Sequence, residues 1–181
     1  MVKLILSRQE ANFLKIRLSA YNPDWIHMFE SEASIWRSLL KDELVRIEHF
    51  GSTAVPGMKA KPVIDMMCTV KVIKKMDLFN EQLIQLGYDV MGEWGIKGRR
   101  FFRKGGENRT HHIHVYQFDS PQIKRHLAVR DYLRTHPEEV RQYIALKEQL
   151  VLMYGDTRDY SKAKHHFVSE LEQRALFWYT D

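Results

Sequence analysis

A glycine and a serine precede a lone carboxylate in this chain, with two lysines between them. Their order along the chain is Gly51, Ser52, Lys59, Lys61 and Asp65. Glycine lets backbone N–H groups approach a phosphate closely, a serine hydroxyl donates a hydrogen bond to it, and a carboxylate on a strand holds Mg²⁺ against the same phosphates. The two lysines add positive charge. The pattern therefore predicts a phosphate-binding loop followed by a catalytic, metal-binding Asp65.

The Gly51–Ser52 pair and Asp65 each also have a purely structural interpretation. A Gly-Ser pair alone is an ordinary turn, and a carboxylate within an apolar run can be held by backbone donors. Asp65, however, lies between Ile64 and Met66, where burial is costly unless the carboxylate meets a cation or several donors. The ordered set therefore favours an Asp65 that faces a ligand.

Two histidines are candidate metal ligands. His112 and His114 are two residues apart, so on a strand both rings point to one face. Together with Asp65 they would form a set of two histidines and one carboxylate, which would prefer Zn, Mn, Fe or Ni over Mg. The divalent metal expected for the site as a whole is Mg, Mn or Zn. The alternative is that these histidines donate hydrogen bonds to a phosphate or are simply solvated. His49 is either a further ligand or a structural partner of the glycine loop.

A basic segment at residues 97–106 is a second source of anion contacts. Arg99, Phe101 and Arg103 would share one face of a strand, and Arg100 would lie on the other. Arginine suits this task because its planar fork binds two phosphate oxygens at once. Arg100 is the preferred ligand contact, and a hairpin with a solvated basic face is the alternative.

The elements that must position these residues follow from capping, periodicity and turn signals. A helix should begin at Asn22–Pro23 and run to about Lys41. Three helices should follow Pro121, with Gly155 separating the last two. The predicted strands are Leu44–Phe50, Val63–Val70, Tyr88–Val90, Arg100–Arg103 and His112–Tyr116, and the further helices are Met76–Leu86, Ile123–Arg134, Pro137–Met153 and Ser161–Tyr179.

Composition limits the class of protein. The chain has 181 residues, 44% of them hydrophobic, which suits one globular domain over residues 1–181. Its net charge of +5 favours anionic partners. A single cysteine, Cys68, permits no internal disulfide and lies in an apolar run that disfavours a catalytic thiol. The opening run Met1–Leu6 is too short for a signal-peptide core, and no later stretch would span a bilayer, so a cytoplasmic location is expected.

The segment His49–Met66 resembles the GrpB family, in which a Gly-Ser-Thr-Ala-Val-Pro-Gly loop leads to Ala-Lys-Pro and an Asp-bearing strand. The likeness extends from Tyr21–Trp25 to Tyr160–Lys164, nearly the whole chain. It implies an α/β (α+β) fold of the nucleotidyltransferase-like type, a mixed sheet flanked by helices with a helical C-terminal third. In that resemblance Lys164 is a further anion contact.

The chain departs from the wider nucleotidyltransferase pattern at one position. A second acid would stand two residues after Asp65, where this sequence has Met67, and the strand His111–Tyr116 carries no carboxylate. The two-metal mechanism is therefore in doubt. Three functions remain open: a metal-dependent nucleotidyltransferase, a non-catalytic module that binds a nucleotide or phosphorylated small molecule, and a nucleic-acid-binding protein. A serine-histidine-acid hydrolase is set aside because the nucleophile-elbow pattern is absent.

Overall fold

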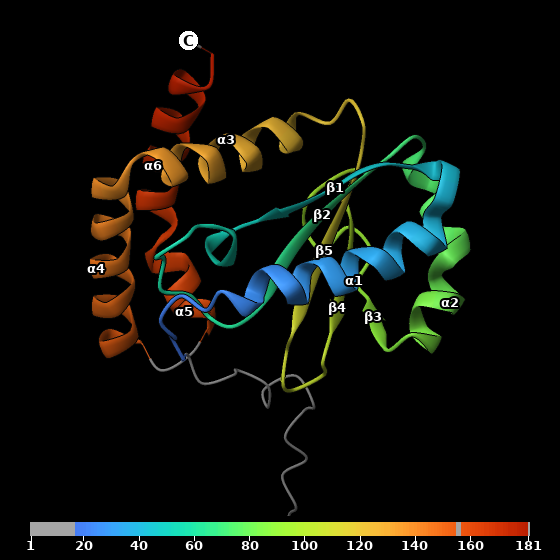
Figure 1. The fold of residues 1–181 in the computed structure, drawn as a ribbon, viewed down its shortest axis with the longest axis horizontal. Helices are drawn as coiled ribbons and strands as arrows, with labels where there is room; N and C mark the ends of the chain where they lie inside the picture. Colours follow the sequence, from blue (N-terminus) through green and yellow to red (C-terminus); the bar gives the residue numbers. More distant parts are fainter. Residues whose placement is uncertain (1–16, 155–156, 181) are drawn as a thin grey trace, which may run out of the picture.

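A five-stranded mixed sheet organises the fold, in the strand order β1-β2-β5-β4-β3. The computed structural model describes residues 17–154 and 157–180. Strands β2 and β5 run parallel, and every other neighbouring pair is antiparallel (Figure 1). Helices flank the sheet, so the predicted fold class is confirmed. Within the described part of the chain, no helix has both the length and the apolar character needed to cross a membrane.

The elements follow the predicted order closely. The strands are β1 (Leu44–Phe50), β2 (Ile64–Val70), β3 (Tyr88–Val90), β4 (Arg100–Lys104) and β5 (His111–Gln117). The helices are α1 (Asp24–Leu40), α2 (Asn80–Gln85), α3 (Pro121–Thr135), α4 (Pro137–Met153), α5 (Thr157–Ala163) and α6 (His165–Trp178). Short 3-10 turns occupy Lys41–Glu43, Ser52–Ala54 and Ile73–Phe79.

Helix α1 begins as its sequence predicts. The Asn22 side-chain oxygen accepts the N–H of Asp24 at 3.0 Å, which satisfies one of the donors left free at a helix start. The apolar stripe of this helix is buried, with Trp25 and Trp36 at 2% and 0% exposure. This stripe packs on the sheet and forms the larger core.

Two predicted helices differ from the structure. The segment predicted as one helix at Met76–Leu86 is a 3-10 turn followed by the short α2, because both helix types repeat apolar residues at nearly the same spacing. The predicted helix Ser161–Tyr179 is divided at Lys164 into α5 and α6. The opening run Met1–Leu6 and the predicted break at Gly155 lie outside the described residues.

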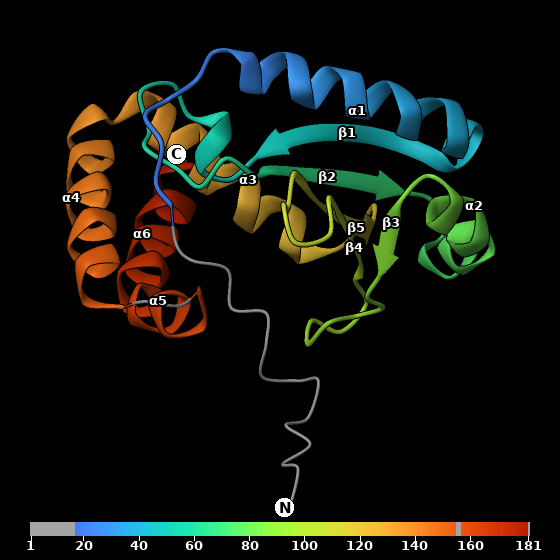
Figure 2. The ribbon, with the colours of Figure 1, turned by 90° about the horizontal axis from the view of Figure 1, so that it is seen from below.

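Strand β2 separates the two faces of the sheet. Ile64, Met66 and Cys68 join the core beneath α1, while Met67 packs with Phe50 on the opposite face, over which α3 lies (Figure 2). Because side chains alternate along a strand, Asp65 belongs to the α3 face. That face of the sheet carries the candidate site.

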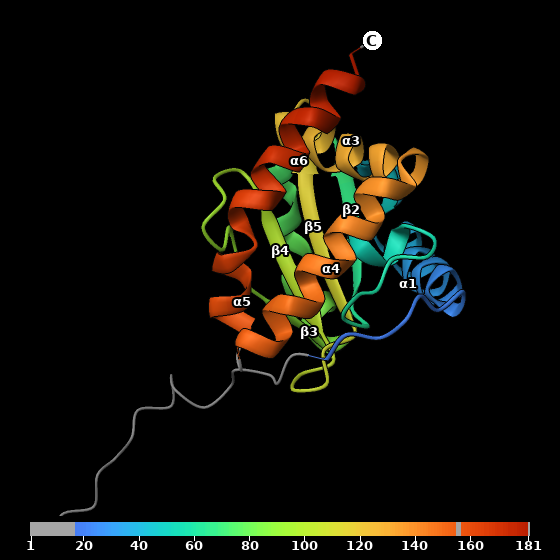
Figure 3. The same cartoon turned by 90° about the vertical axis from the view of Figure 1, so that its left-hand side faces the viewer.

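Helices α4 and α6 stand side by side at the end of the sheet where β1 ends, with α5 below them (Figures 1 and 3). The buried residues of α4 include Val140, Tyr143, Lys147 and Leu150. Their spacing defines one face of the helix. A lysine thus occupies a position in the buried stripe, directed toward the loop that joins β1 to β2.

Candidate functional site

Gly51 lies against the side chain of Asp65. The antiparallel register of β1 and β2 sets Phe50 opposite Asp65, so the next residue passes beside the carboxylate. Gly51 has a φ of 73°, and a Cβ atom there would lie 2.6 Å from Oδ2 of Asp65. Only glycine fits both the backbone conformation and the close approach.

Asp65 and His112 form a polar pair on the α3 face of the sheet. They are neighbours in the parallel register of β2 and β5, and Nδ1 of His112 lies 3.3 Å from Oδ1 of Asp65. The side chains of Asp65 and His112 are 30% and 32% exposed, so a ligand can reach them. Burial opposes ionisation of the carboxyl, but the His112 hydrogen bond and the Lys164 charge hold the pKa of Asp65 below its ordinary value.

His114 is held by a buried arginine. Arg99, which is 5% exposed, donates to Nδ1 of His114 at 3.2 Å and to the Trp94 carbonyl at 2.8 Å. Since a guanidinium has no acceptor, Nδ1 of His114 is the acceptor and the neutral ring carries its proton on Nε2. Burial lowers the pKa of His114 to about 3, which keeps the ring neutral.

This hydrogen bond bears on the predicted metal site of Asp65, His112 and His114. To bind a cation, His114 would have to give up its Arg99 contact or its Nε2 proton. Among residues 17–154 and 157–180, no group of three or more histidine, cysteine or acidic side chains gathers at metal-binding distances. A cation such as Mg, Mn or Zn on Asp65 and His112 stays a prediction.

The usual pair of catalytic metals does not fit these donors. Two metals need carboxylates on both sides of the reacting phosphate. Met67 occupies the position of the second acid and is fully buried among Phe50 and Tyr116. Asp65 is therefore the single carboxylate that β2 offers to the site, and we derive no two-metal chemistry from it.

Lys147 connects α4 to the glycine loop. Its amine lies 3.2 Å from Oγ of Ser52 and also donates to the carbonyl of Lys59. The amine stands 4.5 Å from the centroid of the Tyr143 ring, and the residue is only 2% exposed. Burial, with a smaller contribution from the Lys164 charge, lowers the pKa of Lys147 to about 7.

Lys61 and Lys164 meet over one aromatic ring. Their amines lie 4.8 Å and 5.2 Å from the ring centroid of Tyr160. Burial and the neighbouring charge of Lys164 lower the pKa of Lys61 to about 8, although Asp65 opposes the shift. We call Lys61, Lys147 and Lys164 the lysine cluster. Lys147 contacts Ser52 directly, and Lys61 and Lys164 act electrostatically on Asp65.

Two of the predicted contacts lie elsewhere. The amine of Lys59 forms an ion pair with Glu148 at 2.5 Å, although its carbonyl contacts Lys147. Arg100 binds Asp77 through two hydrogen bonds of 2.6 and 2.9 Å. Arg100 is on the face of β4 opposite the Asp65 side, because its neighbour Phe101 contacts the rings of His112 and His114. The structure therefore does not bring Arg100 to the candidate site.

The basic segment is largely neutralised by neighbouring acids. Besides the Arg100 pair, Arg103 contacts Asp89 at 3.4 Å and Lys104 contacts Glu32 at 2.7 Å. Paired charges release fewer counterions when they meet a phosphate backbone. This segment consequently gives little support to nucleic-acid binding.

His49 acts as a partner of the loop. Its Nε2 lies 2.9 Å from the hydroxyl of Thr53, and its ring stacks on Phe29 at a centroid distance of 4.9 Å. Burial lowers the pKa of His49 to about 4, which matches a neutral ring. Of the two interpretations of His49, the structure shows the structural one.

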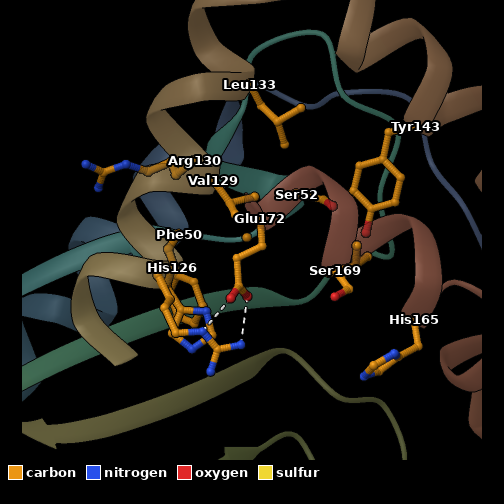
Figure 4. Close-up of a pocket in the computed structure, with 13 residues that line it drawn as sticks. Phe50, Ser52, His126, Val129, Arg130, Leu133, Tyr143, His165, Ser169 and Glu172 are labelled. Carbon is orange, nitrogen blue, oxygen red and sulfur yellow. Dashed lines mark hydrogen bonds and ion pairs between the residues drawn. The ribbon is translucent and has the colours of Figure 1, made fainter. Parts of the chain in front are cut away.

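A cavity of about 420 Å³ opens beside Ser52. Figure 4 shows Ser52 and Tyr143 on one wall and His126 with Phe50 on another, while Glu172 forms an ion pair with Arg125. Helices α3 and α6 add apolar side chains (Val129, Leu133 and Val168) and polar ones (Arg130, His165 and Ser169) to the lining. A cavity of this size holds a small organic molecule.

Lys147 and Arg99 were absent from the set of site residues that the sequence predicted. A signal for Lys147 existed, because a lysine at the same helical spacing as Val140, Tyr143 and Leu150 would be buried. For Arg99, strand alternation predicted the shared face with Phe101 and Arg103. Which face meets Asp65 depends on the pairing of β4 with β5, which no local pattern specifies.

Comparison with known proteins places this chain in a family. The family model described as "GrpB protein" matches residues 15–174. The UPF0157 protein YqkA of Bacillus subtilis is 41% identical over 165 residues, which are 91% of this chain and 48% of that protein. The chain thus spans about half the length of that relative.

Solved structures agree with this assignment. The crystal structure of conserved protein GrpB from Enterococcus faecalis superposes with a TM-score of 0.88 at 43% identity, covering 91% of this chain and all of the other. A structure of Cid1 in complex with the UTP analog UMPNPP gives a TM-score of 0.52 at 12% identity, covering 80% of this chain and 48% of Cid1. The second likeness shows a shared fold alone. The chain belongs to the GrpB family.

Proposed function

We propose that this protein binds a nucleotide or another phosphorylated small molecule, with the phosphates held between the Gly51–Ser52 loop and the lysine cluster. The observation that carries the proposal is the gathering of three lysine amines, with Lys147 on Ser52 and with Lys61 and Lys164 on the Tyr160 ring near Asp65. Their mutual repulsion is costly in a partly buried setting. A ligand with several negative charges would relieve it.

The contacts of Lys147 support the same conclusion. Its amine donates to a hydroxyl and a carbonyl, neither of which carries a charge. An ammonium with neutral partners in a buried position is poorly compensated. A phosphate oxygen beside Ser52 would supply the missing negative charge.

The nucleotide class is proposed from the fold. Cid1 structures of the same fold were determined with a UTP analog and with the product ApU. The cavity beside Ser52 offers mostly apolar walls close to the lysine cluster. A nucleoside in that cavity would place its phosphates near the amines.

Metal-dependent nucleotidyl transfer is the second candidate. It is favoured by Asp65 and His112, which lie together, partly exposed, beside Gly51. The buried Met67 favours the alternative of a module that binds without turnover. Saturable binding with no release of pyrophosphate would distinguish that module from a transferase.

Thermal unfolding with UTP, ATP or tripolyphosphate, each with and without Mg²⁺, Mn²⁺ or Zn²⁺, tests the binding. A ligand at a hundredfold over its dissociation constant stabilises the protein by about 2.7 kcal/mol. Each kcal/mol raises the midpoint by roughly 2–4 °C for a chain of this length. We expect a clear rise with at least one of the phosphate ligands.

A matched pair of lysine variants tests whether the ligand binds at the lysine cluster. Lys164→Met removes a member of the lysine cluster, and Lys162→Met removes an exposed lysine two residues away. Only the first should diminish the ligand-induced rise, while Asp65→Asn should abolish any part that depends on a metal. No rise with any of these ligands, or an equal loss in both lysine variants, would refute the proposed site.

A further inference from the structure

Ser52 and Lys147 form a pair that the binding of a phosphate does not by itself require. A neutral amine has two N–H donors and one lone pair. If one N–H donates to the Lys59 carbonyl, the lone pair can accept the hydroxyl proton of Ser52, whose Oγ lies 3.2 Å away. This is the arrangement of a nucleophile beside its base, of which serine-lysine pairs are one variant.

The surroundings of Lys147 favour the neutral amine. The groups that face it are the Ser52 hydroxyl and the Lys59 carbonyl from the loop, the Tyr143 ring from its own helix, and the charge of Lys164 from the junction of α5 and α6. Burial lowers the pKa of Lys147 to about 7. A substantial fraction of the amine is therefore unprotonated near neutral pH, as a general base must be.

Ser52 also borders the space in which a substrate would lie. Figure 4 shows the hydroxyl groups of Ser52 and Tyr143 on the same wall of the 420 Å³ cavity. The positive φ of Gly51 turns the chain sharply just before Ser52. The Ser52 hydroxyl therefore lies at the start of the 3-10 turn Ser52–Ala54, which follows β1.

We propose that Ser52 is a nucleophile that accepts the terminal phosphoryl group of a nucleoside triphosphate, with Lys147 as its base. This inference rests on the proposed function and adds a covalent step to it. The lysine cluster favours a phosphoryl group over an uncharged electrophile, because Lys61 and Lys164 act electrostatically on Asp65, the residue against which Gly51 lies.

The step conserves atoms and charge. Oγ of Ser52 forms a bond to the γ-phosphorus while the bond between that phosphorus and the β,γ-bridging oxygen breaks. The nucleoside diphosphate leaves with the electron pair, and the hydroxyl proton passes to Nζ of Lys147. The new ammonium then lies beside the phosphoryl oxygens, so its charge stabilises the transition state more than the ground state.

Radiolabelled ATP and UTP test the step, each labelled at the γ- or the α-phosphorus and incubated with the full chain in Mg²⁺ and in EDTA. Intact-mass and peptide analysis locates any label. We expect γ-label on Ser52, no α-label there, and a labelling rate that rises between pH 6 and pH 8. The same samples are followed by thermal unfolding, so nucleotide binding is measured separately from the covalent step.

Three variants make the test specific. Ser52→Ala should abolish the γ-label, whereas Ser169→Ala, which removes the other serine that lines the cavity, should keep it. Lys147→Arg retains a positive charge but cannot act as a base, and should reduce the labelling rate by about a hundredfold or more at nucleotide concentrations that saturate its own thermal shift. Its own unfolding midpoint shows whether it folds.

The outcomes separate the two proposals. Nucleotide binding without γ-label, label that persists in Ser52→Ala, or α-label alone on Ser52 would overturn the phosphoryl-transfer step and leave the binding site intact. No binding of any nucleotide would overturn both proposals.

Discussion

Oγ of Ser52 lies 3.2 Å from Nζ of Lys147, although 95 residues separate them in the chain. The contact joins the loop that follows β1 to a buried position on α4. Through this contact, helix α4 holds the loop that carries Gly51 and Ser52. Helix α4 supplies the amine that faces the serine, and strand β2 supplies the carboxylate against which Gly51 lies.

Replacement of Gly51 should show how tightly the loop is fitted to Asp65. In Gly51→Ala, an unfavourable φ and a contact of 2.6 Å with the carboxylate act together, so we expect a loss of about 2–4 kcal/mol in the free energy of unfolding. Gly57→Ala is the control, because Gly57 has a φ of 78° but no atom within 4 Å of the added Cβ. It should cost about 1 kcal/mol.

Urea unfolding measures both variants. Equal losses for Gly51→Ala and Gly57→Ala would mean that the close approach to Asp65 has no energetic consequence.

The buried amine of Lys147 should make stability depend on pH. Its pKa is about 7 in the folded chain against an ordinary value of 10.5, so between these values the unfolded chain binds more protons. The contribution of Lys147 to the free energy of unfolding therefore rises with pH, by up to about 1.4 kcal/mol per pH unit. Below pH 7 the full cost of burying the charge is present.

Lys147→Met removes this dependence. Relative to the wild type, the variant should be most favoured at pH 6 and should lose more than half of that advantage by pH 9, as measured by urea unfolding at each pH. A difference that stays constant across this range would show that Lys147 keeps its proton in the folded chain.

Replacement of Arg99 or of its neighbour Arg100 should lower the free energy of unfolding by different amounts. Arg100 pairs with Asp77 near the surface, so Arg100→Met should cost about 0–1 kcal/mol and leave the nucleotide-induced thermal shift unchanged. Arg99→Met should cost about 2–4 kcal/mol, because it leaves the Trp94 carbonyl and Nδ1 of His114 without their donor.

Urea unfolding and thermal shifts of both variants check this pair of expectations. If Arg100→Met lost nucleotide binding while remaining folded, the placement of Arg100 away from the site would be contradicted.

Local patterns predicted the parts of this site that are close in sequence. The strand containing Asp65, the turn at Gly51 and the pairing of two histidines on one face all follow from alternation and turn chemistry. The Arg99 face and the Lys147 contact depend on strand pairing and helix docking, which bring together residues far apart in the chain. The division of the last helix at Lys164 is likewise invisible to apolar spacing.

The charge of the lysine cluster permits the most direct test of phosphate binding at this site. A phosphate that binds there should raise the pKa of Lys61, whose value of about 8 lies near neutral pH, so protons should be taken up with the ligand. We would titrate the chain with UTP at pH 8 by calorimetry, in two buffers of different ionisation enthalpy, beside Lys61→Met and the exposed control Lys162→Met. The account predicts binding with proton uptake by the wild type and the control, and a smaller uptake by Lys61→Met. Binding with no proton uptake, or the same uptake in all three proteins, would contradict it.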